Sequence, residues 1–145
     1  MNHDPTTVTP AQFVAEIRAI LAANPDATNP VRYDSQGDAD GCAYNGPNGR
    51  RCVIGEYLYR KNEIVLYSEE GNSASLVMER RDYPYEVRRI ADRIQTYADG
   101  RNVTDPRTLR EVQVPRTWGQ VLDRLDRLAD LYDHDALTDA KEEVA

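Results

Sequence analysis

The 145-residue sequence contains no apolar run near the length that a membrane-spanning helix requires. We therefore expect no association with a membrane. The first residues, MNHDPTT, also lack the basic region and the apolar stretch of a secretory signal. A reducing cytoplasm is then the expected location, where a stable disulfide between the two cysteines is disfavoured.

Histidine is also scarce, with only His3 and His134, and nine residues separate Cys42 from Cys52. This spacing is not that of a zinc site. The sequence has no G-x-S-x-G, no H-E-x-x-H, no P-loop and no G-x-G-x-x-G. We therefore expect no metal and no cofactor, and no motif identifies a catalytic residue.

Charge is unevenly distributed along the chain, whose formal net charge is -7. Residues 1–49 carry two Arg against six acids, residues 50–116 carry 13 Arg and Lys against 11 acids, and residues 117–145 carry three against eight. An acidic chain has little general affinity for nucleic-acid phosphates, although the middle segment leaves room for a local basic patch.

The pattern of apolar residues predicts a single α+β domain over residues 1–145, with a short antiparallel hairpin packed against three to four helices. The termini, 1–7 and 136–145, are expected to be flexible. Thr9-Pro10-Ala11-Gln12 predicts a capped helix that ends near Asn24. Further helices are expected over 73–79, from Pro84 to Gly100, over 105–112 and after Thr117. A short strand is expected at 31–33, and residues 56–67 could form a short helix followed by a strand at 63–67.

Both cysteines flank one predicted turn, in GCAYNGPNGRRCVIGEYLY, residues 41–59. We interpret residues 42–44 and 50–54 as the two strands of a hairpin with a loop that contains Gly49. Cys42 would then oppose Cys52, and Gly55 would end the hairpin. Opposed strand residues are close enough for a disulfide, but in a reducing cell we expect two buried thiols with a structural role.

The last helix begins at a second T-x-x-Q capping sequence, Thr117 to Gln120, and Trp118 is its first large apolar residue. We expect Trp118 to pack on the core as a structural residue. The apolar stripe continues through Leu122, Leu125, Ala129 and Tyr132, all expected to be buried. The same stripe, within residues 117–134, could instead form a homodimer.

The residues Cys42, Tyr44, Gly49, Cys52, Ile54 and Gly55 form the pattern C-x-Y-x4-G-x2-C-x-I-G. This pattern resembles a hairpin found in small uncharacterised proteins of bacteriophages and bacteria, although Arg51 stands where those proteins commonly have Lys. The resemblance implies a phage or prophage origin and no particular activity. The 16 Arg against two Lys would suit an actinobacterial host.

Tyrosine is the other unusual feature, with nine Tyr against one Phe. Tyrosine and arginine are favoured at protein interfaces because they combine apolar area with polar groups. Around the predicted hairpin these types gather in a predicted partner or ligand surface of Tyr44, Arg50, Arg51, Tyr57 and Arg60.

Three classes of function follow from these observations. The first is a non-enzymatic accessory protein of a phage that binds a host protein or sequesters a small ligand. The second is a small enzyme with a carboxylate or thiolate site, since such sites leave no motif. The third is a protein of nucleic-acid biology, which would bind through the Arg-rich middle or mimic DNA with its acidic ends.

Overall fold

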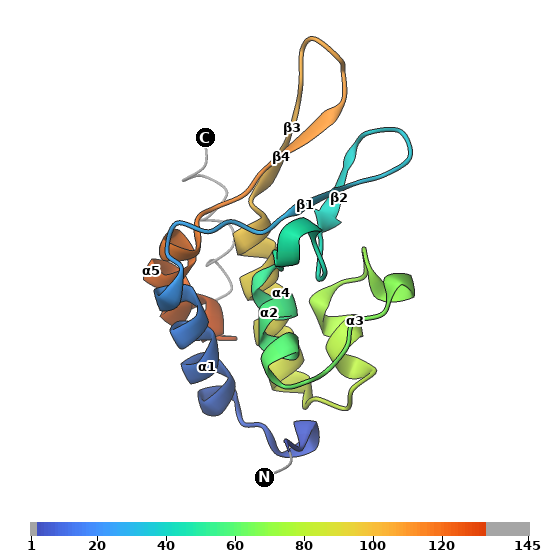
Figure 1. Ribbon diagram of the computed structural model, residues 1–145. Coiled ribbons are helices and arrows are strands. Elements are labelled where there is room, and N and C mark those ends of the chain that lie inside the picture. Colours follow the sequence, from blue (N-terminus) through green and yellow to red (C-terminus); the bar gives the residue numbers. More distant parts are fainter. Residues whose placement is uncertain (1–2, 133–145) are drawn as a thin grey trace.

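The computed structural model describes residues 3–132, which form helices and two small antiparallel sheets (Figure 1). This arrangement confirms the predicted α+β single domain. The α-helices are α1 Pro10–Ala23, α2 Val53–Arg60, α3 Ala74–Glu79, α4 Tyr85–Asp99 and α5 Trp118–Ala129. The strands are β1 Val31–Tyr33, β2 Ala39–Cys42, β3 Arg101–Thr104 and β4 Glu111–Val114. Three short 3-10 helices are η1 Pro5–Thr7, η2 Pro47–Gly49 and η3 Tyr67–Glu69.

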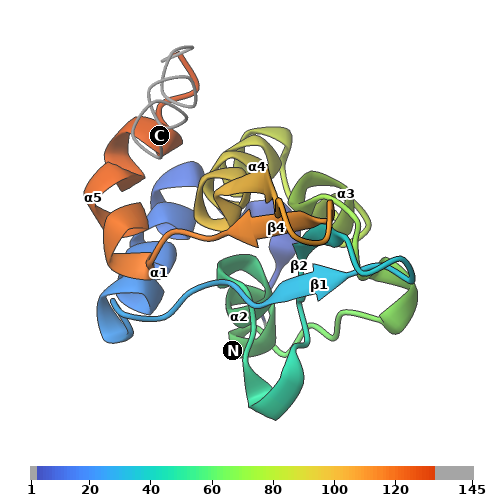
Figure 2. The ribbon, with the colours of Figure 1, turned by 90° about the horizontal axis from the view of Figure 1, so that it is seen from above.

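Helix α4 lies at the centre of the core and contacts each of the other four α-helices. Its buried face includes Val87, Ile90 and Ile94. These residues form one apolar cluster with Ile17 of α1 and Leu125 of α5. Both hairpins, β1–β2 and β3–β4, leave the helices at the same end (Figure 1). Seen from above, β2 and β4 lie side by side over the helices (Figure 2).

The predicted caps of the first and last helices, α1 and α5, are confirmed; we call these two the outer helices. Thr9 Oγ1 accepts a hydrogen bond from Gln12 N at 3.1 Å, and Gln12 Oε1 accepts from Thr9 N at 3.0 Å. The same reciprocal pair joins Thr117 to Gln120 at the start of α5. Each pair satisfies two N–H groups that a helix start would otherwise leave without a partner.

The hairpin predicted at residues 42–54 is wrong. Cys42 ends β2 and pairs with Val31 of β1, whereas Cys52 is the N-cap of α2 and its Sγ accepts from Gly55 N at 3.4 Å. The reason lies in the apolar positions 53, 54, 57 and 58, which recur with the period of a helix. Between the cysteines, Gly49 adopts a left-handed φ of 73° in the turn η2.

Gly55 lies inside α2 rather than after a hairpin. A Cβ atom at this position would be 2.6 Å from the backbone oxygen of Tyr44. Glycine is therefore required for α2 to approach the segment that follows β2.

The helix expected over 105–112 is also wrong, because residues 101–114 form the β3–β4 hairpin. Val103 pairs with Val112, and the turn is closed by Asp105 N donating to Arg110 O at 2.8 Å. Asp105 Oδ1 accepts a hydrogen bond from Arg107 N at 2.9 Å. This bond forms an Asx-turn, in which the Asp side chain stabilises a turn of the backbone instead of the first turn of a helix.

Helix α5 uses its apolar stripe within the chain, where it packs on α1 and α4. Trp118 and Leu125 are buried, and Arg93 of α4 donates to the backbone oxygen of Leu128 at 2.8 Å. Tyr132, which we expected to be buried, is 90% exposed because it follows the end of the helix. A homodimer through residues 117–134 stays a prediction, and residues 133–134 lie outside the described range.

Of the two tails that we expected to be flexible, the structure describes most of the N-terminal one and none of the C-terminal one. Residues 136–145 lie outside the described residues. Within 1–7, Asp4 accepts from Thr6 N at 3.0 Å and caps η1, and His3 Nε2 lies 2.9 Å from the hydroxyl of Tyr83. No helix in the described part of the chain combines the length and apolarity needed to cross a bilayer.

Candidate functional site

The segment between α2 and α3 exposes an unusual amount of apolar surface. Ile64 is 79% exposed, Tyr67 is 90% exposed and Leu66 is also exposed. Tyr59, in the last turn of α2, is exposed beside this segment. We call these four residues, Tyr59, Ile64, Leu66 and Tyr67, the apolar ledge. Three of them fall within four consecutive residues, and Tyr59 lines the same cavity as Ile64. Large apolar side chains exposed together in this way often mark a binding surface.

Two cavities adjoin the ledge and share Asn45 as a lining residue. The larger, of about 400 Å³, is lined by Tyr59 and Ile64 of the ledge and by Arg51. The smaller, of about 270 Å³, is lined by Tyr67 and Arg32. The exposed side chains of the ledge thus stand next to two cavities, which could accept side chains of a bound partner.

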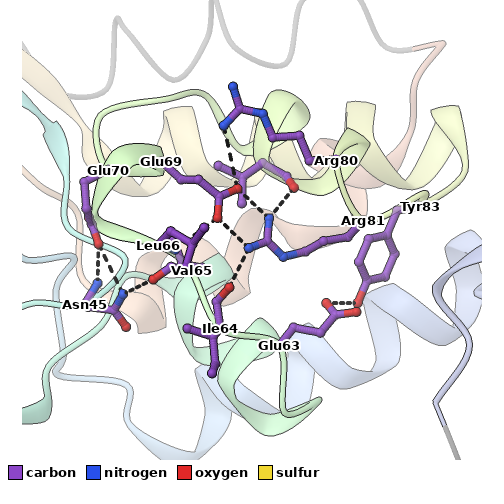
Figure 3. Close-up of polar contacts among 11 residues, drawn as sticks. Asn45, Glu63, Ile64, Val65, Leu66, Glu69, Glu70, Arg80, Arg81 and Tyr83 are labelled. Atoms are coloured by element: carbon purple, nitrogen blue, oxygen red, sulfur yellow. Dashed lines mark hydrogen bonds and ion pairs between the residues drawn. The ribbon is translucent and has the colours of Figure 1, made fainter.

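A buried ion pair contacts the backbone of the ledge at Ile64 (Figure 3). Arg81 Nη1 and Nη2 each donate to one carboxylate oxygen of Glu69, and both distances are 2.7 Å. Arg81 Nη2 also donates to Ile64 O at 2.6 Å, and Nη1 donates to Val77 O at 2.7 Å. A single guanidinium therefore links α3, η3 and the backbone of the ledge.

Glu69 is buried and ionised in this arrangement. Its hydrogen bonds with Arg81, followed by that from Leu66 N, lower the pKa of Glu69 from 4.5 to about 2. Glu69 Oε1 accepts from Leu66 N at 3.0 Å, which fixes the turn into η3. The carboxylate thus positions the ledge backbone as well as neutralising Arg81.

Asn45 and Glu70 hold the other side of the ledge. Asn45 Nδ2 donates to Val65 O at 2.8 Å, and Val65 itself is buried. Glu70 accepts from the backbone N–H groups of Tyr44 and Asn45 at 2.8 and 3.1 Å. Because the backbone is tied on both sides, the exposed side chains stand on a preorganised support.

The predicted surface of Tyr44, Arg50, Arg51, Tyr57 and Arg60 is not one surface in the structure. Tyr44 and Tyr57 are buried. The Tyr44 hydroxyl donates to Asn72 O at 2.7 Å, and the Tyr57 ring packs edge-on against Phe13. Burial raises the pKa of both tyrosines. They are core residues that satisfy their hydroxyl groups internally.

Of the three arginines in that prediction, Arg51 and Arg60 pair with the same carboxylate, Glu56, and Arg50 lies apart from them in another contact. Arg50 donates to Thr28 O at 3.0 Å, and Arg60 pairs with Glu56 at 3.2 Å. Arg51 alone reaches the ledge, where its guanidinium lies 3.6 Å from the centre of the Tyr59 ring. Arg51 and the neighbouring Tyr59, which the prediction omitted, therefore belong to the same surface.

Both cysteines are buried as free thiols, and Gln95 of α4 connects them. Gln95 Nε2 lies 3.1 Å from Cys52 Sγ and also contacts Cys42 Sγ. The hydrogen bond with Cys52 and then burial raise the pKa of Cys42 well above its usual value. A protonated, buried thiol is a poor nucleophile, so the geometry favours packing over catalysis.

We predict that neither thiol reacts with Ellman's reagent in the native protein, because no bulky reagent reaches the buried sulfur atoms. In denaturant, both thiols per chain should react at once. The measurement is absorbance at 412 nm, calibrated with free cysteine. Rapid labelling of one thiol without denaturant would contradict the structural role.

Among residues 3–132, no group of three or more His, Cys, Asp or Glu side chains could hold a metal ion. His3 contacts Tyr83 and lies 3.8 Å from Glu63, a polar contact at the edge of the core. No family model, curated protein or solved structure matches this chain.

Proposed function

We propose that the chain is a non-enzymatic accessory protein, of the phage type that the sequence pattern suggests, which binds a partner protein through the apolar ledge. The observation that carries this proposal is the combination of highly exposed Ile64 and Tyr67 side chains with a backbone tied by Arg81, Glu69 and Asn45. A rigid apolar surface binds without a large ordering cost.

Charge beside the ledge indicates the chemistry of the partner. The two acids that line its cavities are already engaged: Glu70 by backbone N–H groups, and Glu63 by the Tyr83 hydroxyl at 2.7 Å. Arg32, which lines the smaller cavity with Tyr67, has a guanidinium without a hydrogen-bond or ion-pair partner among the described residues. We therefore commit to a partner segment that is apolar and carries an acidic residue.

The proposal is tested by selecting peptides from a displayed random library with the intact protein. Apolar peptides with Asp or Glu should be enriched. Their affinity should fall at least tenfold for the ledge variant Ile64→Ser/Tyr67→Ser, because most of the exposed apolar contact area is lost. Arg32→Glu should weaken the acidic peptides more than matched amide peptides.

The chain offers a matched control. Leu109 is 80% exposed and Tyr132 is 90% exposed, close to the 79% of Ile64 and the 90% of Tyr67. Leu109→Ser/Tyr132→Ser removes similar apolar surface elsewhere and should leave the affinity unchanged. Equal losses in both variants, with circular dichroism showing both folded, would refute binding at the ledge.

A further inference from the structure

A cavity of about 520 Å³ lies where the end of α4, the end of β4 and α5 meet, and we call it the Arg116 cavity. Its volume falls within the range of roughly 300–1,000 Å³ that is usual for small-molecule sites. It shares no lining residue with the two cavities of the apolar ledge. The described residues that line it are Tyr97, Val114, Pro115, Arg116, Gln120, Asp123, Arg124 and Arg127.

Arg116 is fixed in the wall of this cavity and is only 8% exposed. Its backbone N–H donates to Ala98 O at 3.0 Å, and its Nη1 donates to Tyr97 O at 2.7 Å. The guanidinium also lies 4.0 Å from the centre of the Tyr97 ring. These contacts hold a positive charge at the C-terminal end of α4, where the helix carbonyl groups favour it.

Two further arginines bring positive charge to the same cavity. Arg124 and Arg127 are half-buried and lie three residues apart on α5, so their side chains share one face of the helix. Among the described lining residues, the three arginines are accompanied by a single acid, Asp123, which is exposed. The lining therefore has an excess of positive charge, although the chain as a whole is acidic.

The positive charges at this place act on one another. Burial lowers the pKa of Arg116, the Tyr97 side chain opposes this effect, and the charges of Arg124 and Arg101 lower it further. Like charges gathered at a partly buried site raise its free energy, and an anion in the cavity would relieve that cost. Guanidinium groups are matched to oxyanions, because their planar N–H groups donate two parallel hydrogen bonds to one carboxylate or phosphate.

We propose that the Arg116 cavity binds an oxyanion group, a carboxylate or a phosphate, through the guanidinium groups of Arg116, Arg124 and Arg127. One source of this group is a small anionic molecule. The other is the chain itself, because residues 133–145 follow α5 in the sequence and contain one Lys against five acids: Asp133, Asp135, Asp139, Glu142 and Glu143. The same arginines hold the oxyanion in both cases.

Calorimetric titration with inorganic phosphate at pH 7.5 tests the site, with NaCl at equal ionic strength as the reference. It is performed on the unmodified chain and on a full-length acid-neutralised variant, Asp133→Asn/Asp135→Asn/Asp139→Asn/Glu142→Gln/Glu143→Gln. We expect saturable binding of phosphate by at least one of the two chains. No saturation in either chain, or the same signal with NaCl, would overturn the proposal.

The two chains also identify the source of the oxyanion. If phosphate binds both with similar affinity, the site takes a free anion. If the acid-neutralised variant binds phosphate about tenfold more tightly, or alone, the carboxylates of residues 133–145 compete for the same arginines. Phosphate has no apolar part, so this result is independent of binding at the apolar ledge.

Arg124→Gln/Arg127→Gln should weaken phosphate about tenfold or more in whichever chain binds it, because two of the three guanidinium groups are lost. Arg116 is left in place, since it also binds the end of α4. The matched control is Arg89→Gln/Arg107→Gln, which removes the same charge at two exposed positions outside the cavity. Equal losses in the two variants would overturn the site.

A second readout applies if Arg124→Gln/Arg127→Gln fails to fold. The backbone amide resonances of Arg116, Gln120 and Arg124 in the chain that binds phosphate should shift during the titration. They should saturate with the calorimetric affinity. Saturable binding that leaves these three resonances unshifted would place the phosphate elsewhere and overturn the proposal.

Discussion

Replacing Arg81 with methionine should lower the free energy of unfolding by about 3–5 kcal/mol, because the buried Glu69 carboxylate loses both of its hydrogen bonds from a guanidinium. The same change frees Ile64 O and Val77 O, which Arg81 binds at 2.6 and 2.7 Å. Urea denaturation followed by circular dichroism measures the effect. A loss below 1 kcal/mol would mean that the ion pair does not support the ledge.

The adjacent Arg80 is the matched control. Its guanidinium lies 3.8 Å from Glu69, but its side chain is 49% exposed. Surface ion pairs contribute about 0–1 kcal/mol, so Arg80→Met should change stability little. Equal losses at Arg80 and Arg81 would show that net charge, rather than the buried geometry, governs stability.

The pH dependence of the Arg81 effect has a defined sign. Arg81 lowers the pKa of Glu69 from 4.5 to about 2 in the folded state. A group with a lowered folded pKa contributes its full stability above the unfolded pKa and loses it as the pH falls toward the folded pKa. The stability gap between the unmodified protein and Arg81→Met should therefore be largest above pH 4.5 and shrink between pH 4.5 and 2.

Trp118→Ala should cost about 3–5 kcal/mol, because it empties a buried indole site. Trp118 is 5% exposed, and its Nε1 donates to Asn29 Oδ1 at 3.1 Å. The same Asn29 oxygen accepts from Val53 N at 3.0 Å, while Asn29 Nδ2 donates to Asp99. The indole therefore connects α5 to the start of α2 and the end of α4.

Trp118→Phe separates packing from hydrogen bonding in the same experiment. It keeps most of the apolar volume and removes only the bond to Asn29, so it should cost clearly less than Trp118→Ala. Thermal and urea unfolding give both values. A loss near zero for Trp118→Ala would contradict the buried position of the indole.

The outer helices were predictable because their signals are local. Thr9 and Thr117 each precede a glutamine by three residues, and an apolar stripe follows each cap. A short helix was expected only after Gly55, and the start of α2 was assigned to a strand because Cys52-Val53-Ile54 has the composition of a strand. Its period becomes visible only when Tyr57 and Leu58 are included.

The candidate site was harder to predict, because exposure depends on tertiary contacts. Ile64-Val65-Leu66-Tyr67 is an uninterrupted apolar run, and nothing in it distinguishes the buried Val65 from its exposed neighbours. Tyr44 and Tyr57 were assigned to a surface by residue type. Their hydroxyl partners come from other segments, as Asn72 does for Tyr44, so their burial was not visible locally.

The buried polar residues show the same limit. Asn29 lies in a loop sequence of Asn, Pro and Thr that indicates only a turn. In the structure it is buried and joins α2, α4 and α5 through three hydrogen bonds. Its role depends on residues up to 89 positions away in the sequence, and no local pattern contains that information.

The central claim is that partners bind at the apolar ledge, and chemical-shift mapping tests it most directly. Titration of the isotope-labelled protein with a selected apolar, acidic peptide should shift the resonances of Tyr59, Ile64, Leu66 and Tyr67 together with Asn45 and Arg32. Those of Leu109 and Tyr132 should stay unchanged. Saturable shifts centred on α5 or on the β3–β4 hairpin, with the ledge unaffected, would contradict it.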